Sequence, residues 1–336
     1  MTKKQWVWLL VAVAVFAAAG ALSVAVNTWS ARVTADAWGS AFDGFYGSED
    51  TAAVLPSDPF LARLDIRGTI LGGEGTEALL DTDFDETYIL DYIDRLMESD
   101  DNVGILLYVD SGGGEMNAGD EVYLKLMDYK AATGRPIYAY FDDVACSAAY
   151  YIAMAADEIW ANRNSLCVNI GVYISGYNLS GLFERYGVEE VIIKSSENKA
   201  IGSIGQPWTE EQRAIYQSMV DIWYDQFLGV VAEGRGMTKE EVRARDDGRE
   251  MASIQALEAG FIDGIGRFEE YKAQVLGYFD EGTDFYEETP PEPDLFTQLL
   301  RQVSQLRGSG SARSELELLL GLMEDHGQPV VMAYAR

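Results

Sequence analysis

The sequence is poor in the residue types that build most metal and disulfide sites. Its 336 residues include two cysteines, Cys146 and Cys167, and a single histidine, His326. Two cysteines make no disulfide framework, and a zinc site would lack its usual ligands. We therefore expect no metal and no other cofactor. A Ser-His-Asp triad is also disfavoured, because it would have to recruit His326 from beyond an acidic linker, whereas a triad needs a tightly held base.

Basic residues are scarce as well. Lysine and arginine together number 25 against 55 acidic residues, which gives a formal net charge of −30. A surface this acidic repels nucleic acid and anionic lipid headgroups, so we expect no nucleic-acid partner. The hydrophobic content of 48% is nevertheless that of a globular chain with a full apolar core.

One long stretch at the N-terminus carries no charge at all. Residues 6–26 follow Lys3 and Lys4 and match the roughly 20 residues that a helix needs to cross a bilayer. The apolar region of a cleaved signal peptide is shorter, about 7–15 residues. We therefore predict a transmembrane anchor at 6–26, with residues 1–5 in the cytoplasm and the remainder outside. Cleavage of this segment as a signal peptide is the alternative.

The rest of the chain divides by composition. Residues 27–58 are rich in Ala, Ser, Gly and Asp and are expected to form a stalk. Residues 59–280 contain the regular apolar patterns of a folded domain. Residues 281–336 begin with an acidic, proline-containing linker and continue as a C-terminal tail that ends in the strand-like sequence QPVVMAYAR.

Within the domain, short apolar runs alternate with helical patterns. Alternation of this kind predicts an α/β fold with a mainly parallel sheet. Two capping-box pairs, Thr209 with Gln212 and Thr238 with Glu241, mark helix starts. We expect strands at 60–71, 103–110, 136–142, 158–162, 170–174 and 189–194.

A serine stands where one of these strands gives way to a helix. Ser147 lies in the small-residue run ACSAA, directly before Tyr150 and Tyr151. It is either a helix N-cap or a nucleophile that needs a base. Without a suitable histidine the base must be a lysine, whose neutral form is favoured only by burial. Lys194 and Lys199, in VIIKSSENKAIGSIG, are the two candidates.

A glycine run supplies the third part of such a site. Gly112, Gly113 and Gly114 follow a buried strand and precede the next helix. We expect a turn there, whose unpaired backbone N–H groups could stabilise a tetrahedral oxyanion. Glycine at these positions would let a substrate carbonyl approach closely.

Taken in order, these motifs resemble the signal peptide peptidase A family, membrane-anchored Ser/Lys proteases of the ClpP/crotonase fold. The similar segments are VGILLYVDSGGG, CSAAYYIAMAADEIWAN, IGVYI, KSSENKAIGS and DGREMASIQALEAGFIDGIG, between residues 60 and 263. The resemblance implies a fold of repeated ββα units, with Ser147 as nucleophile and Lys199 as base. It assigns the oxyanion hole to Gly113 and Gly114.

Four positions differ from the family pattern. Gly112 stands where the family usually has proline, and Ala148 and Ala149 stand where it has glycines. Asn169 replaces the serine that hydrogen-bonds the catalytic lysine. Its amide oxygen can still accept such a bond, so we expect Asn169 to orient the lysine.

The resemblance implies a membrane-anchored, extracytoplasmic serine endopeptidase that degrades remnant signal peptides and other short hydrophobic peptides. It also implies a homo-oligomer. Two alternatives keep the same fold: a catalytically impaired member that only binds peptides, and a related membrane protease that works with a stomatin-like partner. A crotonase-fold acyl-CoA enzyme is a third, which the anchor and the Ser/Lys pair argue against.

Overall fold

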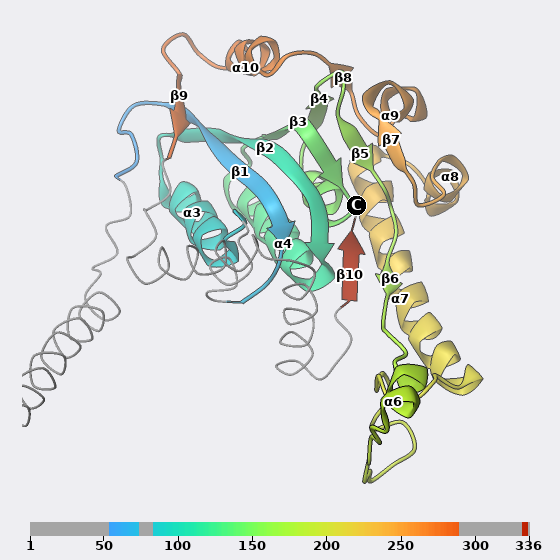
Figure 1. Cartoon of the computed structure of the whole chain (residues 1–336). Helices are drawn as coiled ribbons and strands as arrows, with labels where there is room; N and C mark the ends of the chain where they lie inside the picture. Colours follow the sequence, from blue (N-terminus) through green and yellow to red (C-terminus); the bar gives the residue numbers. More distant parts are fainter. Residues whose placement is uncertain (1–53, 74–82, 289–330, 335–336) are drawn as a thin grey trace, which may run out of the picture. The chain divides into compact units, whose positions relative to one another are not determined.

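A twisted, mainly parallel sheet forms the centre of the computed structural model (Figure 1). The structure describes residues 54–73, 83–288 and 331–334, which belong to one compact unit. Five strands pair in parallel in spatial order: β1 (Phe60–Ile70), β2 (Asn102–Glu115), β3 (Ile137–Cys146), β4 (Glu158–Ala161) and β8 (Gly264–Ile265). This arrangement confirms the α/β prediction and fits a ClpP/crotonase-like fold.

The remaining strands attach to this central set. β9 (Asp284–Glu287) pairs in parallel with β1, within the segment that composition marked as a linker. β5 (Leu166–Val168) pairs in parallel with the end of β3 and antiparallel with β7 (Glu250–Ala252). β10 (Val331–Tyr334) runs antiparallel to both β2 and β6 (Tyr173–Ile174). The strand-like C-terminal sequence is therefore confirmed as a strand.

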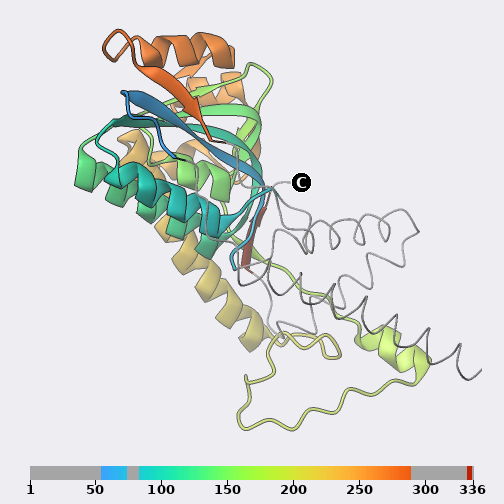
Figure 2. The ribbon, with the colours of Figure 1, turned by 90° about the vertical axis from the view of Figure 1, so that its left-hand side faces the viewer.

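Helices cover both faces of the sheet (Figure 2). On one face lie α3 (Glu86–Glu98), α4 (Met116–Thr133) and α5 (Ala148–Ala153), and the main apolar core fills the space between them and the sheet. On the other face lies α10 (Phe268–Leu276), over a smaller apolar cluster that includes Leu106 of β2. Because β2 is covered on both faces, its sequence is a continuous apolar run instead of an alternating one.

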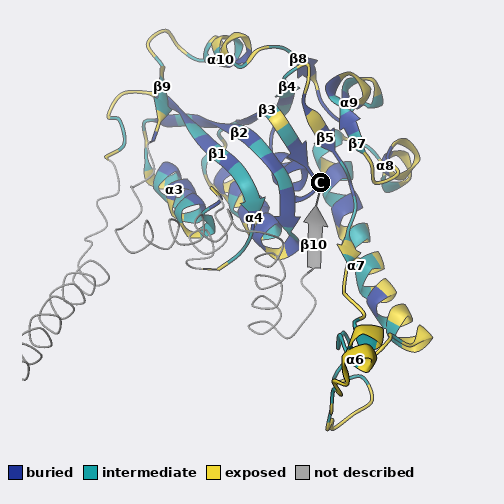
Figure 3. Cartoon of the chain, in the orientation of Figure 1, coloured by how far each residue is buried: buried dark blue, intermediate teal, exposed yellow. Residues whose placement is uncertain are grey.

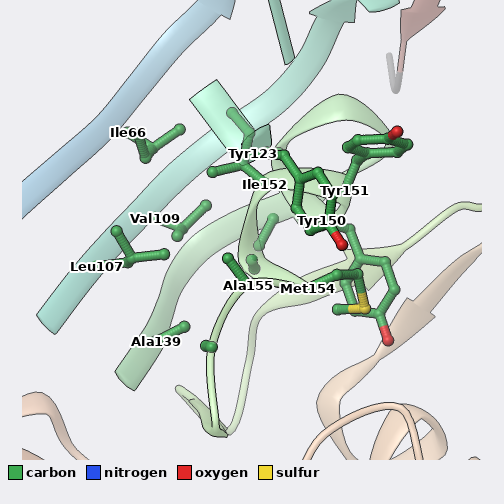
Figure 4. Close-up of a cluster of buried hydrophobic side chains, with 14 of the residues drawn as sticks. Ile66, Leu107, Val109, Tyr123, Ala139, Tyr150, Tyr151, Ile152, Met154 and Ala155 are labelled. Atoms are coloured by element: carbon green, nitrogen blue, oxygen red, sulfur yellow. The ribbon is translucent and has the colours of Figure 1, made fainter. Parts of the chain in front are cut away.

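The short helix α5 depends on this core. All six of its residues are buried, and its tyrosines and Ile152 pack beneath β1–β3 (Figure 4). A six-residue helix is too short to be stable alone, so tertiary packing must hold it. Each large apolar side chain buried here contributes roughly 1.5–3 kcal/mol. Packing of α5 therefore fixes the position of its first neighbour in the chain, Ser147.

Three further helices follow, along the chain, the segments that contain Ser147 and the two candidate lysines. α7 (Glu210–Arg235) and α8 (Lys239–Arg245) both begin with the predicted capping boxes, at Thr209 and Thr238. α9 (Ser253–Ala259) ends at Gly260, whose φ of 80° is the left-handed conformation that glycine adopts without strain. The starts of α7 and α8 were therefore readable from their capping residues.

Residues 175–208 form an extension that we call the arm. It leaves the sheet after β6, contains the helix α6 (Ser180–Tyr186), and lies away from the sheet and its covering helices (Figures 1 and 2). The predicted strand at 189–194 is wrong, because this segment of the arm pairs with no other strand. Two of its apolar residues, Val191 and Ile193, are exposed instead (Figure 3), and Ile193 is 98% exposed.

Several predictions concern residues outside the described ones. The cytoplasmic residues 1–5, the anchor at 6–26, most of the stalk at 27–58 and most of the tail at 281–336 belong to this group. Among the helices of the described part, none has the length and apolarity to cross a bilayer. In residues 54–73, 83–288 and 331–334, no group of His, Cys, Asp and Glu side chains has the arrangement of a metal site.

Candidate active site

Ser147 occupies a strained position at the junction of β3 and α5. Its φ of 56° and ψ of −121° lie outside the regions that an L-residue ordinarily adopts. Two hydrogen bonds hold it there: its N–H donates to the carbonyl of Val168 at 2.8 Å, and its carbonyl accepts from the N–H of Tyr151 at 2.9 Å. Strain of this kind costs of order 1–3 kcal/mol and is concentrated at functional sites.

The Ser147 side chain is buried and has no hydrogen-bond partner. It is 0% exposed, and its Oγ contacts no donor or acceptor in the structure. It also makes no capping bond to the N–H groups of α5. Ser147 is therefore the N-cap residue of α5 by position, but its side chain does not cap the helix. A buried hydroxyl without a partner costs free energy, and this cost is explained if the hydroxyl is kept available for a reacting group.

The glycine run lies inside β2 and not in a turn. Gly113 has a φ of 96°, which favours glycine, and its N–H donates to Ser111 Oγ at 3.1 Å. Ser111 Oγ in turn donates to the carbonyl of Gly68 at 2.6 Å. At Gly114 an added Cβ would lie 2.0 Å from the carbonyl oxygen of Ile70, so only glycine fits. The tight packing of β2 against β1 thus dictates both residues.

Ser147 and the glycine run lie at the same end of the sheet. β2 and β3 pair in parallel as far as Ser111 and Ala145, and there the pairing stops. Two residues further along each strand are Gly113 and Ser147. Because parallel strands advance together, Ser147 and the glycine run both follow the last paired residues at this end of the sheet.

The two candidate lysines lie on the arm and make no contact with Ser147. Lys199 is exposed, and Lys194 Nζ donates to the carbonyl of Glu197 at 2.8 Å. The arm's other bonds are largely internal, such as the one from the Leu179 N–H to the Ile204 carbonyl at 2.7 Å. In the single chain the expected base is therefore separated from the nucleophile.

Asn169 follows β5, beside Ser147. Val168 and Asn169 have φ values of 77° and 55°, which is unusual for residues other than glycine and unfavourable for a β-branched side chain. The Asn169 amide Nδ2 donates to the carbonyl of Gly248 at 2.6 Å. This bond directs the amide of Asn169 toward the loop after α8, and it leaves the side-chain oxygen without an assigned role.

A buried carboxylate supports that loop, and sequence reasoning missed it. Asp246 is 4% exposed, and its Oδ2 accepts from the Gly248 N–H at 3.0 Å, while Oδ1 has no side-chain or backbone bond of good geometry. Burial raises the pKa of this carboxyl to about 6. Its sequence context, RDDGRE, is that of an exposed acidic turn, so nothing in the sequence marked one of the two aspartates as buried.

Cys146 is the residue that could compete with Ser147 as nucleophile. It is 0% exposed, and burial raises the pKa of its thiol far above the usual range, with the nearby Cys167 adding to the effect. Both cysteines are free thiols. Because the thiolate is the reactive form, this setting makes Cys146 inert.

Comparisons with known proteins identify the family of this chain. Residues 130–276 match the description Peptidase family S49. A candidate signal peptide peptidase SppA of Enterococcus faecium is 31% identical over 278 residues, which cover 80% of this chain and 79% of that protein. A candidate protease of Synechocystis is 29% identical, covering 79% of this chain and 88% of the other. The chloroplastic serine protease SPPA of Arabidopsis thaliana is 26% identical, but the match spans only 32% of its length.

Proposed function

The chain belongs to the signal peptide peptidase SppA group of peptidase family S49, and we propose that it is a serine endopeptidase with Ser147 as nucleophile. The observation that carries the proposal is the backbone of Ser147. A strained junction, clamped by two hydrogen bonds, presents a buried Oγ with no partner. The same strand–turn–helix geometry serves nucleophilic serines in other hydrolases.

The base in this proposal is Lys199 of a second copy of the chain. A lysine acts as a base only where burial favours its neutral form, and the exposed Lys199 of the single chain lacks that burial. The arm that carries it also exposes large apolar side chains, as interfaces between subunits do before assembly. These are Tyr177, Leu182, Tyr186, Val188, Val191 and Ile193. Docking of the arm against a second copy would bury them, desolvate Lys199 and bring it to Ser147.

The reaction then follows the Ser/Lys pattern of acyl transfer. Ser147 Oγ attacks the scissile carbonyl carbon while Lys199 Nζ takes the hydroxyl proton. The carbonyl oxygen becomes an oxyanion, which the N–H groups of Gly113 and Gly114 stabilise. Because Gly113 donates to Ser111 Oγ in the free chain, the oxyanion replaces that hydroxyl as acceptor. Lys199 returns the proton to the leaving amine, and water then hydrolyses the acyl-enzyme with Lys199 again as base.

Substrates in this proposal are remnant signal peptides and other short hydrophobic segments. An anchor at residues 6–26 would hold the catalytic domain outside the cytoplasm, close to the bilayer where such peptides remain. Removal of residues 1–27 should move the protein from the membrane fraction to the soluble fraction. If the protein purified from cells already lacks these residues, the segment is a signal peptide and the anchor is refuted.

Labelling with a fluorophosphonate probe tests the nucleophile. The wild-type chain should be labelled on Ser147, and both Ser147→Ala and Lys199→Ala should lose labelling and peptide hydrolysis. Lys194→Ala is the matched control and should keep both. An unlabelled, inactive wild-type chain with an intact fold would instead identify a peptide-binding module.

Mixing two inactive variants tests whether the base comes from a second copy. Ser147→Ala and Lys199→Ala chains should be mixed in equal amounts under conditions that exchange subunits. Random assembly pairs an intact serine with an intact lysine at about one quarter of the sites, so about one quarter of wild-type activity should return. A mixture that exchanges subunits and stays inactive would show that each chain supplies its own base.

A further inference from the structure

The junction that presents Ser147 is held in an unfavourable backbone conformation. In the part of the chain that the structure describes, all three non-glycine residues with a positive φ lie here: Ser147, Val168 and Asn169, at 56°, 77° and 55°. Each such conformation costs free energy and persists only where the surrounding structure holds it. The Ser147 N–H donates to the Val168 carbonyl at 2.8 Å. Interactions that hold Val168 and Asn169 therefore also hold the nucleophile.

The side chain of Asn169 supplies one such interaction. Its Nδ2 donates to the carbonyl of Gly248 at 2.6 Å. The Val168 carbonyl and the Asn169 N–H belong to one planar peptide group, so a rotation at Asn169 would also turn the carbonyl that binds the Ser147 N–H. β5 and β7 lie side by side, and their pairing places the loop 246–249 next to Asn169 (Figure 1).

Asp246 in turn holds Gly248. Its Oδ2 accepts a hydrogen bond from the Gly248 N–H at 3.0 Å. Gly248 has a φ of 85°, a conformation that favours glycine, and in it the N–H binds Asp246 while the carbonyl binds Asn169. Hydrogen bonds and one peptide group thus connect the Asp246 carboxyl with the backbone of Ser147.

Burial distinguishes Asp246 from an ordinary turn residue. An aspartate that accepts from the N–H two residues further on is common in exposed turns and by itself only closes a loop. Asp246, however, is 4% exposed. Burial raises the pKa of its carboxyl to about 6, and the N–H groups of Gly248 and Ile170 oppose this rise, so the carboxyl also faces the residue after Asn169. Ionisable groups buried in this way cluster at functional sites.

We propose that Asp246 is a positioning residue for the nucleophile Ser147. It does not touch the substrate, and it acts through the hydrogen bonds of Gly248 and Asn169. The inference rests on the proposed function, because it takes Ser147 to be the nucleophile. Without the Asp246 acceptor, Gly248 can turn and release Asn169, and the junction can relax toward ordinary φ values. Displacement of the reacting Oγ by about 1 Å lowers a rate on the order of 100-fold.

Steady-state peptide hydrolysis separates this role from a purely structural one. Asp246→Ala removes the acceptor and should lower kcat at least about tenfold, with KM within about twofold of wild type, because the groups that bind substrate stay in place. Asp246→Asn keeps an accepting oxygen and should restore kcat to within about threefold of wild type. Asp247→Ala is the matched control, since Asp247 is exposed, and should behave as wild type. A wild-type kcat in Asp246→Ala, or an equal loss in Asp246→Asn, would overturn the proposal.

A double variant tests whether the effect runs through Asn169. If both residues belong to one chain of hydrogen bonds, the combination of Asp246→Ala with Asn169→Ala should have a kcat within about twofold of the less active single variant. Losses that multiply would show that Asp246 and Asn169 act independently, which contradicts the proposed connection.

Hydrogen–deuterium exchange tests the positioning without catalysis. In Asp246→Ala, peptides that cover the loop 246–249 and the junction 142–153 should both exchange faster than in wild type, because both lose hydrogen bonds. In Asp246→Asn neither should exchange faster. Faster exchange in the loop alone would confine Asp246 to a local structural role, and faster exchange in α4 as well would indicate general destabilisation; the proposal fails in either case. If the wild-type chain hydrolyses no peptide, the proposed function fails, while the exchange pattern still decides whether Asp246 holds Ser147.

Discussion

Replacement of the buried Asp246 by asparagine should stabilise the protein, and only above about pH 5. The carboxyl has almost no exposed surface, and it accepts a hydrogen bond from the Gly248 N–H. Burial penalises the charged form and raises its pKa to about 6. Asparagine keeps the shape and the accepting oxygen but carries no charge.

The size of the effect follows from the pKa difference between folded and unfolded states. An ordinary aspartate has a pKa near 3.9, so the folded value of about 6 is about 2 units higher. Between about pH 4 and 6 the folded state binds more protons than the unfolded state, so the free energy of unfolding falls as the pH rises. Above about pH 7 this decrease in the free energy of unfolding is complete and amounts to about 3 kcal/mol.

Chemical denaturation between pH 4 and pH 8 measures this difference. Asp246→Asn and the wild-type chain should have equal free energies of unfolding near pH 4. At pH 7.5 the variant should be more stable by about 3 kcal/mol, equivalent to a melting temperature roughly 6–12 °C higher. The neighbouring Asp247 is exposed and its pKa is lowered by Arg249, so Asp247→Asn is the matched control and should show no such gain. A difference between Asp246→Asn and wild type that does not change with pH would refute the desolvation argument.

Three other predictions concern the site and the arm. Gly114→Ala should abolish activity and lower the melting temperature, because its Cβ would lie 2.0 Å from the Ile70 carbonyl oxygen; Gly171→Ala, with open space around it, should do neither. Cys146→Ala should keep most activity, and mass spectrometry should find Cys146 of the wild-type chain unlabelled by iodoacetamide. An iodoacetamide adduct on Cys146, together with loss of hydrolysis in Cys146→Ala, would make Cys146 the nucleophile. Ile193→Asp should leave the fold intact, since the side chain is 98% exposed, but weaken self-association in analytical ultracentrifugation and reduce activity; unchanged sedimentation would remove the arm from the interface.

Elements with local signals were predictable. The buried strands β2 and β3 follow from continuous apolar runs, and α7 and α8 follow from their capping boxes. The wrong strand at 189–194 had the same kind of apolar run, in EEVIIK. Val191 and Ile193 of this run are exposed in the single chain, so the apolar pattern there reflects a surface and not a sheet. A pattern of apolar residues indicates a buried surface, but it does not show whether the same chain or a second copy buries it.

The site, like the fold, has parts that a local sequence signal predicts and parts that it does not. Ser147 could be proposed from its neighbours in the sequence, because a strand-to-helix junction built of small residues is a local feature. Its hydrogen bond to Val168 depends on the pairing of β3 with β5, and the burial of Asp246 depends on the packing of a loop, neither of which the sequence displays.

The absence of a base beside Ser147 in the single chain connects these observations. A buried hydroxyl without a hydrogen-bond partner and an apolar surface on the exposed arm are both unfavourable for an isolated chain, and Lys199 on that arm lacks the burial that a base needs. Burial of the arm against a second copy would relieve both of these costs and complete the dyad in the same step. Activity would then depend on assembly, because in an unassembled chain Ser147 has no base beside it, and peptide cleavage would be restricted to the complete enzyme.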